Sequence, residues 1–343
     1  MDEKKSSKLW LNIIIVLIIL VCLIVWVISQ NDITDVINSI KNANIGYLLM
    51  GIGIIAIYWI CNALTQTIIV KKNENIKIKD AMHIANAAQF YNCITPYQVG
   101  GNAFMVLYYH RLGIKPEKSI GYVVMSFIIH QLALNILSIL AVILYFNYIK
   151  NEIDGLWVMV IIGFVINFSI LAFLFMVASF AWFRKFVIFL LSKILSLKPF
   201  RNKKDEILES SNQKIMEFQT GFKELVNHKM MLMITLMIKI IGLIAYFMTP
   251  FFVFYALGVH VGIEKIWFII WMSAFAFVIM SYMPTPGAAG GAEWAFNQVF
   301  ISLPGVSKVL AATATLLWRF VTYYLSMLCG LLSVFLFERR KEE

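Results

Sequence analysis

The segment Ser281–Phe300 reads SYMPTPGAAGGAEWAFNQVF and decides the fold. Pro284 and Pro286 end the helix of the apolar tract before them, because proline lacks an N–H donor and blocks the preceding turn. The glycines that follow free the backbone, and a new helix is predicted from Glu293. Irregular backbone within an apolar chain must be buried in protein or line a wet cavity. The segment therefore predicts a break inside a membrane.

A second break lies in the first half of the chain. Asn86–Ile114 reads NAAQFYNCITPYQVGGNAFMVLYYHRLGI, with Pro96 followed four positions later by Gly100 and Gly101. Basic residues flank it on both sides, so we expect it to enter and leave from the cytoplasmic side. Two interrupted segments at corresponding positions of two halves are typical of a transporter built from an internal repeat.

Composition places the rest of the chain in lipid. Hydrophobic residues make up 61% of the 343 positions and charged residues 14%, against roughly 25% charged in soluble domains. The net charge of +10 comes mostly from lysines and arginines in short connections, which indicates membrane topology and not a nucleic-acid partner. The cysteines and histidines lack metal-ligand spacing, so we expect no metal.

The number of crossings follows from the apolar tracts and the loop charges. Seven crossings from a cytoplasmic N-terminus would leave the basic C-terminus outside, so Pro286–Leu303 is predicted to be a short eighth crossing or half of a broken pair. We expect an all-α polytopic membrane protein with about eight crossings, two broken or re-entrant segments and both termini cytoplasmic. The tracts long enough to span about 30 Å are Trp10–Ile28, Ile45–Val70, Ile120–Tyr148, Leu156–Phe183, Met231–Leu257, Ile266–Met283 and Val309–Phe337.

The whole chain, 1–343, is predicted to be one membrane domain made of two halves, which form a candidate inverted repeat. The apolar stretch Phe186–Leu197 has lysines around it and is predicted to lie in the membrane interface. The expected parts are a first half 1–183 with its broken segment 81–110, a cytoplasmic amphipathic linker 184–230, and a second half 231–343 with its broken segment 284–303.

Charges inside the apolar tracts mark a candidate site. Glu293 and Arg319 lie where an unpaired charge costs several kcal/mol, and Tyr323 lies one turn beyond Arg319. Arg319 either neutralises Glu293 or binds a lipid phosphate bidentately, and an ion pair that only fixes packing is the structural alternative. The helices that restart after the breaks are expected to present unpaired N–H groups, which favour an anion.

Other polar residues have two interpretations. His130, Gln131, Asn135 and Ser138 form a stripe that either faces a cavity or bonds between helices, and Lys239 is expected to snorkel to the inner interface. No motif for a nucleophile, ATP or a cofactor is present, so we expect no catalytic residues and no cofactor. The candidate lipid-binding residues are Thr95, Pro96, Gln98, Gly100, Gly101, Asn102, His130, Gln131, Pro286, Gly287, Gly290, Gly291, Glu293, Arg319 and Tyr323.

Four motifs resemble the membrane domain of the lysylphosphatidylglycerol synthase/flippase family: ITPYQVGGNAFMVLYYHRLGI (Ile94–Ile114), MSFIIHQ (Met125–Gln131), PTPGAAGGAE (Pro284–Glu293) and LLWRFVTYYLSMLCG (Leu316–Gly330). Relatives often carry glutamine at the position of Asn102. The positions that match the family's typical motifs are Thr95, Pro96, Gly100, Gly101, Pro284, Pro286, Gly287, Gly290, Gly291, Glu293, Arg319 and Tyr323.

The resemblance implies lipid handling in a bacterial plasma membrane. Long family members attach an amino acid to phosphatidylglycerol with a soluble C-terminal domain, which we do not expect in this chain. We therefore expect a flippase or scramblase for an anionic or aminoacylated phospholipid, such as lysyl-phosphatidylglycerol. The alternatives are a membrane-embedded lipid transferase, with Glu293 and His110 or His130 as acid and base, a protein that handles polyisoprenyl-phosphate glycolipids, or a scaffold. The expected partners are membrane phospholipids and a separate lipid-synthesising enzyme, and a homo-oligomer is compatible with the sequence.

Overall fold

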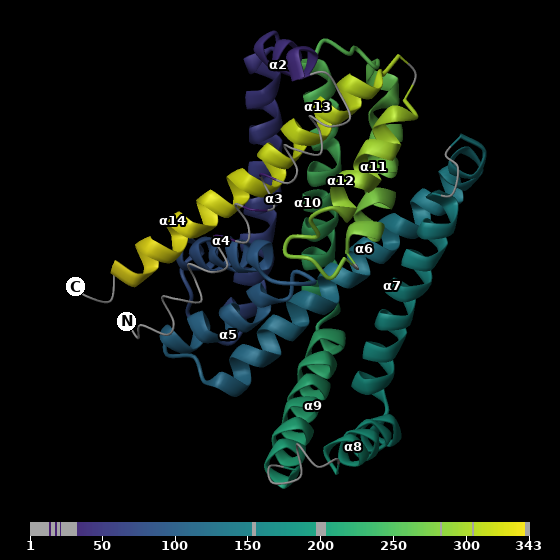
Figure 1. The fold of residues 1–343 in the computed structure, drawn as a ribbon. Coiled ribbons are helices and arrows are strands. Elements are labelled where there is room, and N and C mark those ends of the chain that lie inside the picture. The colour runs from purple at the N-terminus through teal and green to yellow at the C-terminus, as the bar shows by residue number, and fades with distance from the viewer. Residues whose placement is uncertain are drawn as a thin grey trace.

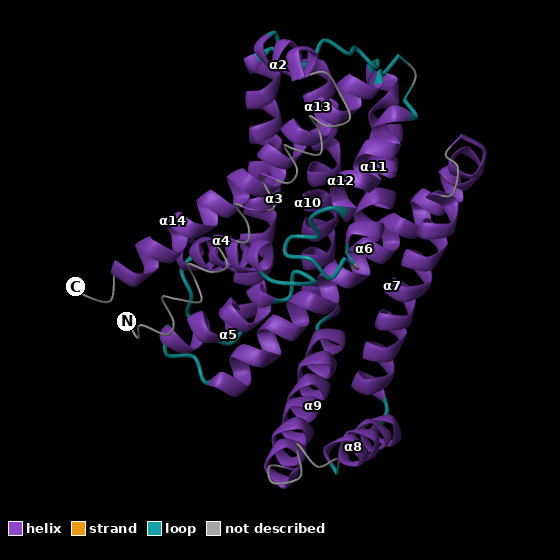
Figure 2. Cartoon of the chain, viewed as in Figure 1, coloured by secondary structure: helices purple, strands orange, loops and turns teal. Residues whose placement is uncertain are grey.

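Helices joined by loops form the described part of the chain, as Figure 2 shows. The computed structural model describes residues 33–152, 156–196, 204–281, 283–303 and 305–339, with residues 14, 18 and 21. This all-helical architecture confirms the predicted class (Figure 1). The helices are α2 (Ile33–Lys41), α3 (Ile45–Lys71), α4 (Ile78–Ile94), α5 (Gly100–Arg111), α6 (Pro116–Glu152), α7 (Leu156–Ser179), α8 (Ala181–Leu195), α9 (Lys204–Asn227), α10 (Lys229–Ala256), the 3-10 turn η2 (Ile263–Lys265), α11 (Ile266–Met280), α12 (Gly291–Ile301), α13 (Lys308–Arg319), the π-helical turn η3 (Phe320–Tyr324) and α14 (Leu325–Arg339).

Five stretches of helix in the described residues are long and apolar enough to cross a membrane. They lie in α3, α6, α7, α10 and the continuous run from α13 through α14, and each corresponds to a predicted tract. The chain is therefore a multi-pass membrane protein. Apart from residues 14, 18 and 21, the first predicted crossing, Trp10–Ile28, lies outside the described residues.

The remaining two predicted crossings are too short to span. Helix α11 has 15 residues and α12 has 11, so at 1.5 Å per residue they extend about 22 and 16 Å, against a core of about 30 Å. The breaks at Pro284 and Pro286 separate them, and the two helices pack together. Of the two readings of this region, the structure shows the broken pair and not a separate eighth crossing.

Helices α3 and α10 run antiparallel and define two ends of the molecule. The backbone N–H of Asn44, just before α3, donates to the carbonyl of Ala256 at the end of α10 (2.8 Å). At the other end Lys72, just after α3, pairs with Glu224 shortly before α10 (3.1 Å). We refer to these as the Asn44 end and the Lys72 end.

Helices α4 and α5 form a hairpin that begins and ends at the Lys72 end. Glu74 precedes α4, Lys118 lies just inside α6 after α5, and their side chains pair at 2.7 Å. This agrees with the prediction that the first broken segment enters and leaves on one side.

Helices α11 and α12 form a second hairpin at the opposite end. Tyr148 donates its hydroxyl to the carbonyl of Ser302, which follows α12 (3.1 Å), and its ring packs against Phe268 at the start of α11 (4.8 Å between centroids). Because α11 follows the end of α10, this hairpin begins and ends at the Asn44 end. The order span, hairpin, span thus occurs twice with inverted direction: α3, α4–α5, α6 and then α10, α11–α12, α13–α14.

The predicted linker forms two helices between the halves. Helix α8 begins five residues before the predicted stretch and carries exposed Trp182, Phe186 and Phe189. Helix α9 packs on the span helices: a Cβ on Gly221 would lie 3.5 Å from Gly121 Cα in α6, and Gln219 Nε2 donates to the Val177 carbonyl of α7 (2.7 Å). Helix α9 therefore packs against α6 and α7 of the first half and leads into α10.

Charge pairing fixes α9 at the Lys72 end. Burial raises the pKa of Glu224, but hydrogen bonds from Asn73 and Lys72 outweigh it, so the pKa lies below its ordinary value. The folded protein thus holds this carboxylate charged.

Candidate functional site

The tip of the first hairpin is closed by its own side chains. Thr95 Oγ1 accepts a hydrogen bond from the Gly100 N–H (2.9 Å), and Asn92 Oδ1 accepts from the Gly101 N–H (2.7 Å). A Cβ on Gly101 would lie 2.4 Å from the Ala88 carbonyl oxygen, so only glycine lets α5 approach α4 this closely. The predicted unpaired N–H groups at the start of α5 are thus paired at these two glycines.

The tip of the second hairpin is closed in the same manner. Glu293 Oε2 accepts from the Gly290 N–H (2.6 Å), as a carboxylate does in the first turn of a helix. Gly287 and Ala288 adopt left-handed backbone angles, φ 59° and 58°. The prediction of unpaired N–H groups is therefore wrong at Gly290 as well, because an acidic side chain of the same helix occupies the position expected for an external anion.

The two tips meet. Pro96 and Pro286 form an isolated antiparallel bridge, which joins the two breaks that the sequence singled out. The first tip also holds non-glycine residues in the left-handed region, Tyr97 (φ 54°) and Gln98 (φ 55°). Such backbone costs about 1–3 kcal/mol per residue and is concentrated at functional sites. The contact between strained tips is the structural centre of the candidate site.

Tyr323 in η3 contacts both tips. Its hydroxyl donates to the Cys93 carbonyl at the end of α4 (2.9 Å). Its ring packs on Gly287 of the other hairpin so closely that a Cβ there would lie 2.2 Å from the ring. Turns of π-helix inside α-helices often mark functional sites. Tyr323 thus links the last span to both hairpins.

Arg319 and Glu293 form a buried ion pair. Arg319 Nε donates to Glu293 Oε1 at 2.7 Å, and the side chains are 2% and 5% exposed. Arg319 Nη2 also donates to the Gly287 carbonyl (3.2 Å), and the guanidinium lies 4.9 Å from the centre of the Tyr323 ring. Of the two roles left open, the structure shows neutralisation of Glu293. The same contacts fix the second tip to the last span.

A polar cavity lies beside the first tip, between the two hairpins and the spans. Its volume is 220 Å³, and α3, α4, α5, α6, α10 and α11 contribute to its wall. Its exposed side is formed by Tyr97 and Val99, which are 56% and 57% exposed. The polar residues in the wall, other than the tyrosines, are Asn62, Gln66, Gln89, Asn92, Gln98, Asn102, Ser126, His130, Gln131, Lys239 and Ser281.

Lys239 is the charged side chain among the described residues that line this cavity. It is 5% exposed, and Lys239 Nζ donates to Asn62 Oδ1 in α3. The prediction that Lys239 snorkels to the interface is therefore wrong. The neighbouring span supplies a polar partner at the same depth, so the side chain remains inside the bundle.

The predicted site residues fall into two groups. Gln98, Asn102, His130 and Gln131 line the polar cavity. The others lie at the tips or in the ion pair, outside the cavity wall: Thr95, Pro96, Gly100, Gly101, Pro286, Gly287, Gly290, Gly291, Glu293, Arg319 and Tyr323.

Both interpretations of the polar stripe on α6 apply, each to different residues: some line the cavity and others form hydrogen bonds within or between helices. His130 and Gln131 line the cavity, whereas Asn135 donates to Asn167 Oδ1 of α7 (3.2 Å) and Ser138 bonds its own helix. Glu293 is absent from the cavity wall that contains His130. Of the acid and bases of the transferase alternative, His130 lines the cavity, Glu293 pairs with Arg319, and His110 Nδ1 lies 3.4 Å from the Ile114 carbonyl oxygen.

Sequence reasoning missed the wall formed by α3 and α4. Tyr58, Asn62 and Gln66 recur every four residues on α3, and Gln89 and Asn92 share a face of α4. This spacing was the available signal, because polar residues one turn apart on a span usually face the protein interior.

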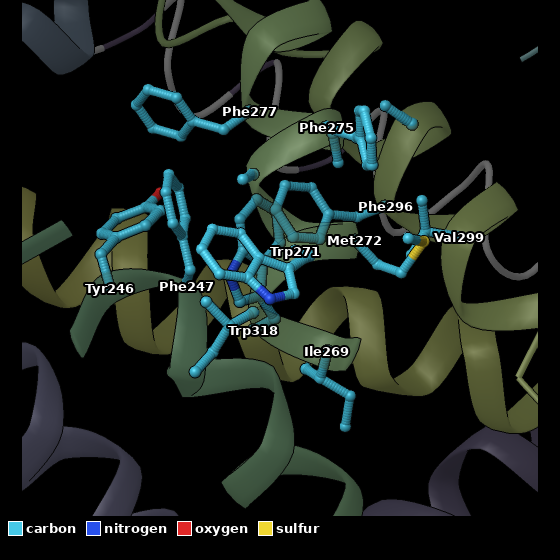
Figure 3. Close-up of a cluster of buried hydrophobic side chains, with 14 of the residues drawn as sticks. Tyr246, Phe247, Ile269, Trp271, Met272, Phe275, Phe277, Phe296, Val299 and Trp318 are labelled. Atoms are coloured by element: carbon cyan, nitrogen blue, oxygen red, sulfur yellow. The ribbon is translucent and has the colours of Figure 1, made fainter. Parts of the chain in front are cut away.

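An aromatic cluster separates the polar cavity from a hollow at the Asn44 end. Tyr246 and Phe277 belong to the cavity wall and to the cluster of Figure 3, where Phe296 stacks on Trp318 (3.6 Å). Further along α10, Tyr255 lines the hollow, which measures 630 Å³ and contains many amide and hydroxyl groups. The described structure thus has a polar cavity within the bundle, a polar hollow at the Asn44 end and an apolar cluster between them.

The fold and the site define a polytopic membrane protein with two facing helical hairpins and a polar cavity within the bundle. Residues 12–330 match the family described as Lysylphosphatidylglycerol synthase TM region, and the chain belongs to that family. The family is associated with flipping or handling of lysyl-phosphatidylglycerol. A comparison with curated proteins finds no significant match.

Proposed function

We propose that the protein moves the head group of a membrane phospholipid between leaflets, as a flippase or scramblase. The observation that carries the proposal is the polar cavity beside the first of two strained hairpin tips that meet within a bundle of spanning helices. Water-filled or polar space at that depth marks substrate pathways. Gln98, Asn102, His130 and Gln131 contact the head group in this proposal.

The cargo is amphiphilic, and the cavities suit that property. A cavity of 420 Å³, whose described lining residues are all hydrophobic, lies between α6, α7, α9 and α10. Ile128 and Leu132 of α6 line it, while His130 and Gln131 of the same helix line the polar cavity. In the proposal the head group occupies the polar cavity and an acyl chain remains on the apolar side of α6.

Movement of the tips is the step that passes the head group on. In the described state, the path from the polar cavity to the hollow at the Asn44 end is blocked by three features. They are the Pro96–Pro286 bridge, Tyr323 and the aromatic cluster. Inverted halves allow one hairpin to open while the other stays closed, as in alternating access. The Lys72 end, which carries the basic connections, is cytoplasmic in this proposal.

Transport is tested with proteoliposomes that contain fluorescent phosphatidylglycerol or lysyl-phosphatidylglycerol. Dithionite bleaches only the outer leaflet, so a protein that moves lipid raises the bleached fraction above about half. The expected result is faster loss of the protected fraction than in empty vesicles. Equal rates in protein-containing and empty vesicles for both lipids would contradict the proposal.

A further inference from the structure

The charge of the polar cavity comes from one side chain. Lys239 is the sole lysine, arginine, aspartate or glutamate among the described residues that line it. The side chain is 5% exposed, and its hydrogen bond goes to the neutral amide of Asn62. None of the ion pairs found between described residues includes Lys239. Among the described residues, this buried cation therefore has only an amide as its hydrogen-bond partner, and it lines the cavity.

An anionic ligand would complete this arrangement. Removing an ammonium group from water is costly unless an opposite charge and further hydrogen bonds compensate it. A phosphodiester supplies that charge, and amide side chains such as Gln98 and Asn102 supply donors for its remaining oxygens. Hydrogen bonds to charged groups are also stronger than neutral ones.

Among the described residues that line the cavity, no carboxylate is available to pair with a cationic head group. The carboxylate of Glu293, in the second tip, is already occupied, because Arg319 Nε donates to its Oε1 and the Gly290 N–H donates to its Oε2. The cavity of 220 Å³ is also smaller than the roughly 300–1,000 Å³ of sites for drug-sized ligands. An added lysyl group would bring one or two positive charges and extra volume next to Lys239.

We infer that Lys239 selects lipids with a net negative phosphodiester head group and disfavours their lysyl esters. The cargo is then an unmodified anionic phospholipid such as phosphatidylglycerol, in contrast to the lysylated lipid after which the family is named. The inference rests on the proposed function for its link to transport, but the binding preference can be measured without transport.

The test is binding of short-chain lipids to the purified full chain in detergent. Dihexanoyl phosphatidylglycerol, its lysyl ester and dihexanoyl phosphatidylcholine are compared by microscale thermophoresis. We expect phosphatidylglycerol to bind about tenfold or more tighter than the other two, the worth of one charge-assisted hydrogen bond. Lys239→Met should remove this preference and Lys239→Arg should keep it. Lys229→Met, which removes an exposed lysine from the same helix, is the matched control and should bind like the wild type.

A second variant neutralises the charge of the cavity. Asn62→Asp places a carboxylate at the present hydrogen-bond partner of Lys239 and should lower phosphatidylglycerol affinity while raising that of the lysyl ester. Equal or tighter binding of the lysyl ester by the wild type would overturn the inference, as would an unchanged preference in a folded Lys239→Met protein. Selective binding of phosphatidylglycerol without any movement of lipid in vesicles would overturn the proposed function and leave the inference standing.

Discussion

The buried pair of Arg319 and Glu293 allows a quantitative prediction. Removing one partner of such a pair costs about 3–5 kcal/mol of unfolding free energy, since the other charge is left buried and uncompensated. We expect this loss for Arg319→Met and for Glu293→Leu, because both side chains are at most 5% exposed. Arg319→Met also leaves the Gly287 carbonyl without its guanidinium donor. The double variant should lose less than the two single losses added together, with a coupling energy of about 2–3 kcal/mol.

The assay is equilibrium unfolding in mixed micelles, followed by tryptophan fluorescence. Trp318 lies beside Arg319 and in the core cluster, so its environment reports on this region. The matched control is the pair of Glu74 and Lys118, whose lysine is 53% exposed. Its removal should cost about 0–1 kcal/mol. Single losses below about 1 kcal/mol at Arg319 and Glu293, or strict additivity in the double variant, would refute the reasoning.

Three further predictions concern the tips and the Lys72 end. Gly287→Ala should lower the unfolding free energy by about 1–3 kcal/mol in the same assay. The reason is that φ at Gly287 is 59° and the Tyr323 ring occupies the space of a Cβ. Gly53 has open space around it, so Gly53→Ala should leave the unfolding free energy unchanged. Tyr323→Phe should cost about 1 kcal/mol through loss of the 2.9 Å bond to the Cys93 carbonyl, and an unchanged midpoint would contradict that role. The pKa of Glu224 is lowered in the folded protein. Its charged form therefore stabilises the fold above the ordinary pKa near 4.5, and this stabilisation is lost as the pH falls below that value. In Glu224→Gln the thermal midpoint should depend less on pH in this acid range than in the wild type.

Much of the fold could be predicted from local sequence. Runs of apolar residues as long as Ile45–Val70 must be helical in lipid, because only internal hydrogen bonds satisfy the backbone there. The two Pro and Gly motifs located both hairpin tips to within a few residues, because proline and glycine act on the local backbone. Local sequence does not decide the number of crossings, since a short helix can either cross the membrane or turn back. The structure shows that α11 and α12 turn back. Helix α11 is short, and Tyr148 contacts both the start of α11 and the residue that follows α12.

The site was only partly predictable, for a physical reason. Whether Lys239 reaches the interface or stays inside depends on Asn62, which is far away in sequence and adjacent only after α3 packs on α10. The same limit applies to the N–H groups of Gly100 and Gly290, whose partners are side chains placed by the turn itself. Long-range packing therefore determined where charge is available, and local sequence determined where the backbone breaks.

The most direct test of the account is to lock the two tips together. A Pro96→Cys/Pro286→Cys protein places two cysteines at an antiparallel bridge, where Cα separations of about 4.5–5.5 Å suit a disulfide. The native cysteines Cys61, Cys93 and Cys329 and Cys22 are first replaced by alanine. Lipid movement in proteoliposomes is then measured with the pair oxidised and after reduction. The account predicts arrest on oxidation and recovery on reduction to the rate of the cysteine-free parent. Full transport by a protein shown to be cross-linked would contradict it.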